Sequence, residues 1–167
     1  MKKLTLMRHA KSSWADSDIP DVDRTLGERG RKAADLLGKW LETSGHAPDQ
    51  VIVSSAARCQ ETWELVSAGL TNTPTVITEA ALYMASPEEI LNIIRKTATG
   101  DNVMVIAHMP GIGSLARALR VDPAPAHTAF DKYPTGGTTV LELQGDWAAL
   151  DFGTTHLDTY ITPADLG

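Results

Sequence analysis

The sequence has a single cysteine, no long apolar run and a shortage of positive charge, and each absence excludes a class of protein. Cys59 alone cannot form an intrachain disulfide or build a cysteine-rich metal site. No segment is apolar over enough residues to span a bilayer or to act as a signal peptide, so we expect a cytoplasmic protein without a membrane partner. With 15 Lys and Arg against 21 Asp and Glu, the net charge is -6. That balance argues against a nucleic-acid partner, because non-specific binding needs a basic surface.

Internal repeats, low-complexity tracts and interdomain linkers are also missing. The 167 residues are enough for one domain with a substantial core. A hydrophobic content of 43% with 22% charged residues is ordinary for a globular protein, so disorder is not expected. We predict that residues 1–167 form a single domain.

Short apolar runs alternate with amphipathic segments along the chain, which predicts an α/β fold. Strands are expected at residues 4–7, 51–53, 75–78 and 103–107, of which 4–7 and 103–107 read as buried. A helix is expected after each of these strands, with one apolar stripe facing the core. The four stripes are Ala33, Leu37, Trp40 and Leu41; Trp63, Val66 and Leu70; Ile90, Ile93 and Ile94; and Ile112, Leu115, Ala116 and Leu119. The first of these helices follows Gly27, the third begins at a Ser86 cap, and the fourth follows Pro110-Gly111. The predicted architecture is a single-domain three-layer sandwich, in which helices flank a mostly parallel central sheet.

The C-terminal third of the chain has weaker patterns. Residues 121–137 are rich in Pro, Ala and Gly and are expected to be irregular. Two closing strands are predicted at residues 138–143 and 148–152, joined by a turn around Gly145-Asp146. The tail after Thr155 has no specific pattern, and no element is predicted there.

Polar side chains suited to binding an anion follow three of the predicted strands. Arg8-His9 follows the first strand, Ser54-Ser55 with Arg58 follows the second, and His108 follows the fourth. In open α/β sheets ligands bind outside the carboxyl ends of the strands, so these loops would meet at one edge. A lone histidine after a strand is most often a polar loop residue, but two arginines and two histidines at successive strand ends indicate one site.

Each of these four side chains suits phosphoryl transfer. A neutral imidazole is a good nucleophile near pH 7, so His9 is the candidate nucleophile, and a covalent intermediate would divide one hydrolysis into two steps. Arg8 and Arg58 supply planar forks of donors for the phosphoryl oxygens, on which charge develops in the transition state. His108 would donate to the same oxygens. We expect no metal ion and no other cofactor.

These blocks resemble the signatures of the histidine phosphatase superfamily, whose fold is phosphoglycerate mutase-like. The run at residues 7–12 (MRHAKS) is similar to the first signature, Ser54-Ser55-x-x-Arg58-x-x-x-Thr62 to the second, and His108-x-Pro110-Gly111 to the third. Arg24-Thr25-Leu26-x-Glu28-x-Gly30 resembles a block of the small SixA-type phosphohistidine phosphatases. The resemblance covers nearly the whole chain. It implies that His9 is the phosphorylated nucleophile, that Arg8, Arg58 and His108 form the phosphate pocket, and that Arg24 is a further phosphate or substrate contact.

Two positions depart from the pattern of the superfamily. Met109 stands where the third block commonly has Asn. The mutase-like branch usually has an acidic proton donor just after the third strand, where this chain has Met84, and nearby Glu79 has the wrong offset and is expected to be a surface residue. A general acid is worth ~10²–10⁴ in rate when an alkoxide leaves, whereas phosphohistidine releases imidazole, a better leaving group. The hypothesis is therefore a phosphohistidine substrate, on a phosphorylated protein of the histidine phosphotransfer type.

Other phosphate chemistries fit the sequence less well. A Cys-x₅-Arg phosphatase would need Arg where Leu65 stands, so Cys59 is expected to be a small core residue. Asp21-Val22-Asp23-Arg24-Thr25 matches the Asp-x-Asp-x-Thr pattern of haloacid dehalogenase enzymes, but no buried strand precedes it. The chain has no Gly-x₄-Gly-Lys-Ser/Thr loop. Two alternatives stay open: a small-molecule phosphomonoesterase of the same superfamily, which would act on a small phosphate ester, and a non-catalytic module that binds phosphoproteins.

Overall fold

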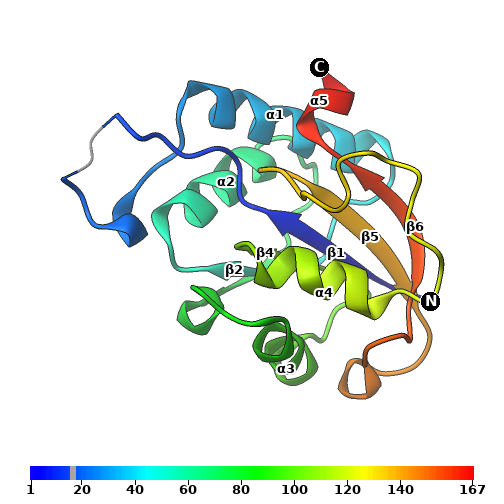
Figure 1. Ribbon diagram of the computed structural model, residues 1–167. Coiled ribbons are helices and arrows are strands. Elements are labelled where there is room, and N and C mark those ends of the chain that lie inside the picture. The colour runs from blue at the N-terminus through cyan, green and yellow to red at the C-terminus, as the bar shows by residue number, and fades with distance from the viewer. Residues whose placement is uncertain (16–17) are drawn as a thin grey trace.

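A computed structural model describes residues 1–15 and 18–167, which are arranged around one six-stranded sheet (Figure 1). The strand order is β3-β2-β4-β1-β5-β6. The strands are β1 (Lys2–Arg8), β2 (Gln50–Ser54), β3 (Thr75–Glu79), β4 (Asn102–Ala107), β5 (Thr138–Leu143) and β6 (His156–Ile161). The first four pair in parallel, whereas β5 and β6 are antiparallel additions at one edge. The prediction of a mostly parallel sheet is confirmed.

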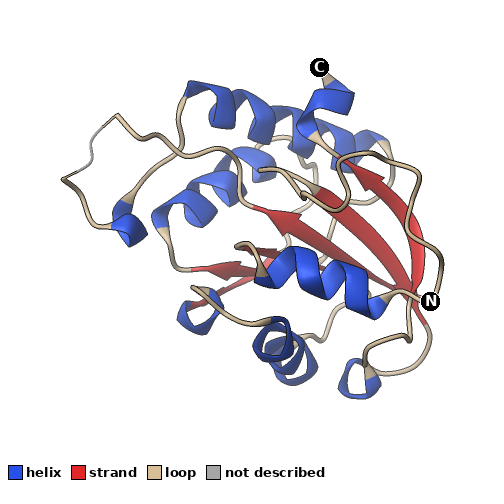
Figure 2. Ribbon diagram, viewed as in Figure 1, coloured by secondary structure: helices blue, strands red, loops and turns tan. Residues whose placement is uncertain are grey.

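Helices cover both faces of this sheet and give the predicted three layers (Figure 2). One face carries α1 (Glu28–Thr43), α2 (Ala57–Ser67) and the short α5 (Pro163–Leu166), and the other carries α3 (Pro87–Thr97) and α4 (Gly111–Leu119). Successive strand residues point to opposite faces, so Leu4 and Leu6 of β1 pack in the core under α3 and α4, and Met7 packs under α1 and α2. No helix among the described residues is long and apolar enough to cross a bilayer.

The parallel register brings the carboxyl ends of β1, β2 and β4 to one edge of the sheet. Arg8 pairs with Ala107 at the end of β4, and Val53 of β2 pairs with Ile106 on its other side. The backbone N–H of His9 donates to the carbonyl oxygen of Ala107 at 3.1 Å, which extends the pairing one residue further. The loops that follow these three strands therefore start side by side, as the site prediction requires.

The helices match their predicted segments with two local differences. The capping box at the start of α3 is present: Ser86 and Glu89 each accept from the other's backbone N–H. In α1 the buried stripe includes Ala34 rather than Ala33, which is only partly buried. In the next helix, α2 ends at Ser67, so Leu70 packs against the core from the turn that follows.

The predicted strand at residues 148–152 is wrong. Trp147–Ala149 forms a 3-10 turn instead, and the Trp147 indole N–H donates to the carbonyl oxygen of Gly100 at 2.7 Å. Trp147 and Leu150 are buried in the core beneath α3, which explains the apolar pattern that suggested a strand. The partner of β5 is β6, which lies in the tail where no element was predicted. Among the residues of β6, only Tyr160 is buried. Because β6 is an edge strand, its sequence has little of the apolar alternation that identifies a strand.

Candidate active site

A cavity of about 430 Å³ lies at the sheet edge where β1, β2 and β4 end. All five predicted site residues line it, although they come from four separate stretches of the chain. The lining residues are Arg8, His9, Lys11, Ser12, Trp14, Arg24, Arg58, His108, Met109, Pro134 and Thr135. The arginines and Lys11 make the cavity positive in a protein of net negative charge.

The ring of His9 is only 6% exposed, and its contacts determine where its proton lies. Nδ1 lies 2.7 Å from the carbonyl oxygen of Ala10, and a carbonyl can only accept, so Nδ1 carries the proton. Nε2 is therefore unprotonated, and it accepts a hydrogen bond from Arg58 Nε at 3.3 Å. Burial, together with the charges of His108, Arg58 and Arg8, lowers the pKa of His9 to about 3. At neutral pH the lone pair of Nε2 is available as a nucleophile.

The guanidinium of Arg58, in the first turn of α2, connects the components of the site. Besides His9, its Nη1 donates to the backbone oxygen of Asp21 at 2.8 Å, and its Nη2 donates to the Asp21 carboxylate at 3.1 Å. Nη2 also lies 3.4 Å from Nδ1 of His108. These contacts hold the buried guanidinium in one orientation across the cavity.

Thr62 ties α2 to the segment that carries His9. Its hydroxyl donates to the carbonyl oxygen of Arg58 at 2.7 Å and accepts from the backbone N–H of Ala10 at 3.0 Å. Thr62 is fully buried, so both bonds are shielded from water. This explains the threonine four residues after Arg58: it fixes the segment that carries His9 relative to the arginine.

His108 and Arg8 complete the predicted set. Nε2 of His108 lies 2.8 Å from the hydroxyl of Ser54, and burial, with the charge of Arg58, lowers the pKa of His108 to about 4. Nη1 of Arg8 donates to the carbonyl oxygen of Tyr133 at 3.0 Å. Its Nε is buried and has no hydrogen-bond partner among the described residues. The site therefore holds an arginine with unused donor capacity.

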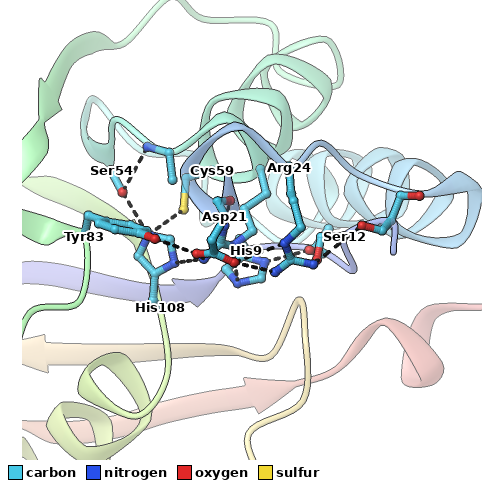
Figure 3. Close-up of polar contacts among 12 residues, drawn as sticks. His9, Ser12, Asp21, Arg24, Ser54, Cys59, Tyr83 and His108 are labelled. Carbon is cyan, nitrogen blue, oxygen red and sulfur yellow. Dashed lines mark hydrogen bonds and ion pairs between the residues drawn. The ribbon is translucent and has the colours of Figure 1, made fainter. Parts of the chain in front are cut away.

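Asp21 is a site residue that the sequence analysis missed (Figure 3). Its carboxylate accepts from Tyr83 Oη at 2.5 Å, from Arg24 Nε at 3.1 Å and from Arg58 Nη2 at 3.1 Å, so it lies at the centre of the polar network. The hydrogen bond from Tyr83, together with Arg58 and Arg24, lowers the pKa of Asp21 to about 2. In the sequence, Asp21 stood out only as part of the Asp-x-Asp-x-Thr pattern of haloacid dehalogenase enzymes, which implies a different chemistry. The useful signal was its position three residues before Arg24, across a single turn.

Arg24 reaches the cavity through contacts on both sides. Nη1 donates to the hydroxyl of Ser12 at 3.0 Å, and the guanidinium carbon lies 3.5 Å from the centre of a Trp14 ring. Its ion pair with Asp21, at 3.0 Å, links it to Arg58 through a shared carboxylate. Arg24 is 7% exposed, which is unusual for an arginine and indicates a fixed position.

Known proteins resemble this chain in sequence and in fold. The model of the histidine phosphatase superfamily (branch 1) matches residues 4–83. A solved structure of the putative phosphohistidine phosphatase SixA from Nakamurella multipartitia has a TM-score of 0.80 and 30% identity, covering 97% of this chain and 96% of its own. The chain belongs to the histidine phosphatase superfamily. An uncharacterized protein of Mycobacterium tuberculosis is 37% identical over 94% of this chain and 99% of its own length. A structure of the protein histidine phosphatase SixA complexed with tungstate has the same fold, with a TM-score of 0.75, 20% identity and 99% coverage of both chains.

In this member of the superfamily, Met84 and Glu79 lie near the usual position of the proton donor, but their surroundings do not suit that role. Met84 is 81% exposed, and the carboxylate of Glu79 accepts from the backbone N–H of Ala81 at 3.3 Å, which caps a 3-10 turn. Neither residue lines the cavity. Cys59 is buried, and burial raises the pKa of its thiol to about 12, so its prediction as a small core residue is confirmed.

Proposed function

We propose that this protein is a phosphatase that removes the phosphoryl group from protein phosphohistidine through a covalent intermediate on His9. The observation that carries the proposal is the unprotonated Nε2 of His9, held 3.3 Å from Arg58 Nε in a cavity that Arg8 and His108 also line. A nucleophile of this kind with fixed cationic donors is what phosphoryl transfer needs. Binding alone would not need the buried neutral imidazole.

In the first step the Nε2 lone pair of His9 attacks phosphorus, and the P–N bond of the substrate breaks. The substrate imidazole leaves with the electron pair of that bond and with the proton on its other ring nitrogen. Arg8 and Arg58 would donate to the phosphoryl oxygens, and the dianion would raise the pKa of His108 so that it donates as well. In the second step the oxygen of water attacks phosphorus and the P–Nε2 bond breaks. The electron pair of that bond returns to Nε2 of His9, and the protons of the water leave with inorganic phosphate.

The state of Asp21 supports phosphohistidine over an alkyl phosphate as substrate. With its pKa at about 2, this carboxylate is an anion at neutral pH and has no proton to give to a departing alkoxide. Exchange of one P–N bond for another also requires no strong acid.

Phosphate release tests the proposal. The substrates are a phosphohistidine-bearing phosphotransfer protein, phosphoimidazole and a panel of alkyl phosphate esters, all with chelator present. Selective release from the P–N substrates, lost in His9→Ala and retained in His156→Ala, is the expected result; His156 is an exposed histidine on β6 and is the matched control. Equal or faster turnover of alkyl esters would reject the substrate class. Binding of the phosphoprotein without turnover would favour a recognition module.

A further inference from the structure

A second hollow, of about 520 Å³, adjoins the cavity beside α1. Lys11, Pro134 and Thr135 line both, so the two spaces are adjacent. Beyond these shared residues the hollow runs along the first half of α1 to the start of α5. We name it the basic groove; its charged lining is Lys11, Arg29 and Lys32, and its apolar lining includes Leu36, Pro134 and Pro163.

The cations of the basic groove have little internal compensation. Lys11 and Arg29 form no ion pair among the described residues, and both are exposed. Lys32 lies 3.6 Å from Glu28, but both side chains are more than 70% exposed, so this pair contributes little. Three cations therefore converge beside the cavity of a protein whose net charge is -6. Such a local reversal of sign attracts an anionic group.

We propose that the basic groove binds an acidic segment of the phosphorylated protein while its phosphohistidine occupies the cavity; this rests on the proposed function. Because the groove and the cavity share three lining residues, a substrate as large as a protein can contact both at once. The cations select acidic side chains, and the apolar lining offers a surface for the aliphatic parts of the same segment. A polar metabolite such as a sugar phosphate would leave that apolar lining unused.

Charge reversal on α1 tests this role without touching the cavity. Arg29→Glu/Lys32→Glu changes two exposed residues that line only the groove. The control, Lys39→Glu/Lys96→Glu, makes the same change in net charge at two exposed residues that do not line the groove. Of the two control positions, Lys39 matches Lys32 more closely than Lys96 does, because Lys39 and Lys32 each form an ion pair with a carboxylate four residues earlier on α1. Circular dichroism verifies that both variants fold.

The readout is kcat/KM for two substrates at low and high salt. For the phosphorylated phosphotransfer protein we expect a loss of about tenfold or more at low salt in the groove variant, and a smaller loss at high salt, because rim charges act mainly on association. For phosphoimidazole, which fits the cavity alone, the groove variant should stay within about twofold of the wild type. The control variant should match the wild type on phosphoimidazole and lose much less than the groove variant on the protein.

The outcomes separate this inference from the function on which it rests. If the wild type releases phosphate from neither substrate, the proposed function fails, and the inference about the groove fails with it. If the wild type is active and the groove and control variants behave alike on the protein, the groove does not bind the substrate. An equal loss on phosphoimidazole would mean that these residues act on the cavity instead.

Discussion

Acidification from pH 7.5 to 4.5 should destabilise the folded protein through its two buried neutral histidines. Burial lowers the pKa of His9 to about 3 and that of His108 to about 4, whereas an unfolded chain has histidine pKa values near 6.5. Below pH 6.5 the unfolded chain takes up protons on these rings that the folded chain does not. Stability is therefore complete above the unfolded pKa and falls as the pH falls toward the folded values.

The size of the effect follows from the two shifts. Each pH unit between the folded and unfolded pKa values costs about 1.36 kcal/mol for each histidine. At pH 4.5, two units below the unfolded value, each ring should contribute a loss of about 2.5 kcal/mol. Both rings are less than 8% exposed, so solvent screens them little. A joint loss of about 5 kcal/mol would be a large part of a typical stability of 5–15 kcal/mol.

Urea unfolding, followed by tryptophan fluorescence at half-unit steps of pH, measures this loss. His9→Asn cannot take up the proton, so its free energy of unfolding should decline by about 2 kcal/mol less than that of the wild type over the same range. The comparison uses the slope of the free energy of unfolding against pH, because the substitution also changes the stability at neutral pH. His156→Asn, at an exposed position on β6, controls for loss of a histidine outside the site. Parallel profiles for the wild type and His9→Asn would refute the reasoning.

Four substitutions at three positions test the contacts that build the site. Arg58→Ala should lower kcat for phosphoimidazole by ~10²–10³-fold, and Arg58→Lys should recover little, because one ammonium cannot replace a fork that holds several partners. Ser54→Ala removes the hydroxyl 2.8 Å from Nε2 of His108 and should lower kcat by about tenfold with a smaller change in KM. Gly30→Ala should lower the melting temperature by roughly 5–10 °C in calorimetry, because its Cβ would lie 2.0 Å from the carbonyl oxygen of Lys11.

Each of these tests has an outcome that would contradict it. Full activity in Arg58→Lys would mean that charge alone suffices and that the fork geometry is dispensable. An unchanged kcat in Ser54→Ala would show that His108 does not depend on this hydroxyl for its orientation. A melting temperature in Gly30→Ala equal to that of the wild type would show that the backbone of Lys11 moves aside without cost.

Much of the site was predictable because its main residues lie at the ends of strongly apolar strands. His9, Ser54 and His108 each follow a buried run, and parallel strands present their carboxyl ends at one edge of a sheet. Local sequence patterns were sufficient there, as they were for the capping box of α3. The candidate nucleophile, His9, follows from such patterns, because a strand end and the residue after it are adjacent in the chain.

Only the tertiary structure showed the contacts that join distant parts of the chain. Asp21 meets Tyr83 across 62 residues and Arg58 across 37, and no local pattern encodes either contact. β6 is recognisable only by its pairing with β5, since an edge strand with one buried side chain has little apolar periodicity. The basic groove likewise needs α1, α5 and the loop before β5 to come together. The sequence by itself determined which of the buried strands form and which residues follow them, because burial requires a periodic pattern of apolar residues that is local in the chain. Only the tertiary structure decided the network of Asp21 and the shape of the basic groove, because those contacts join residues that are far apart along the chain.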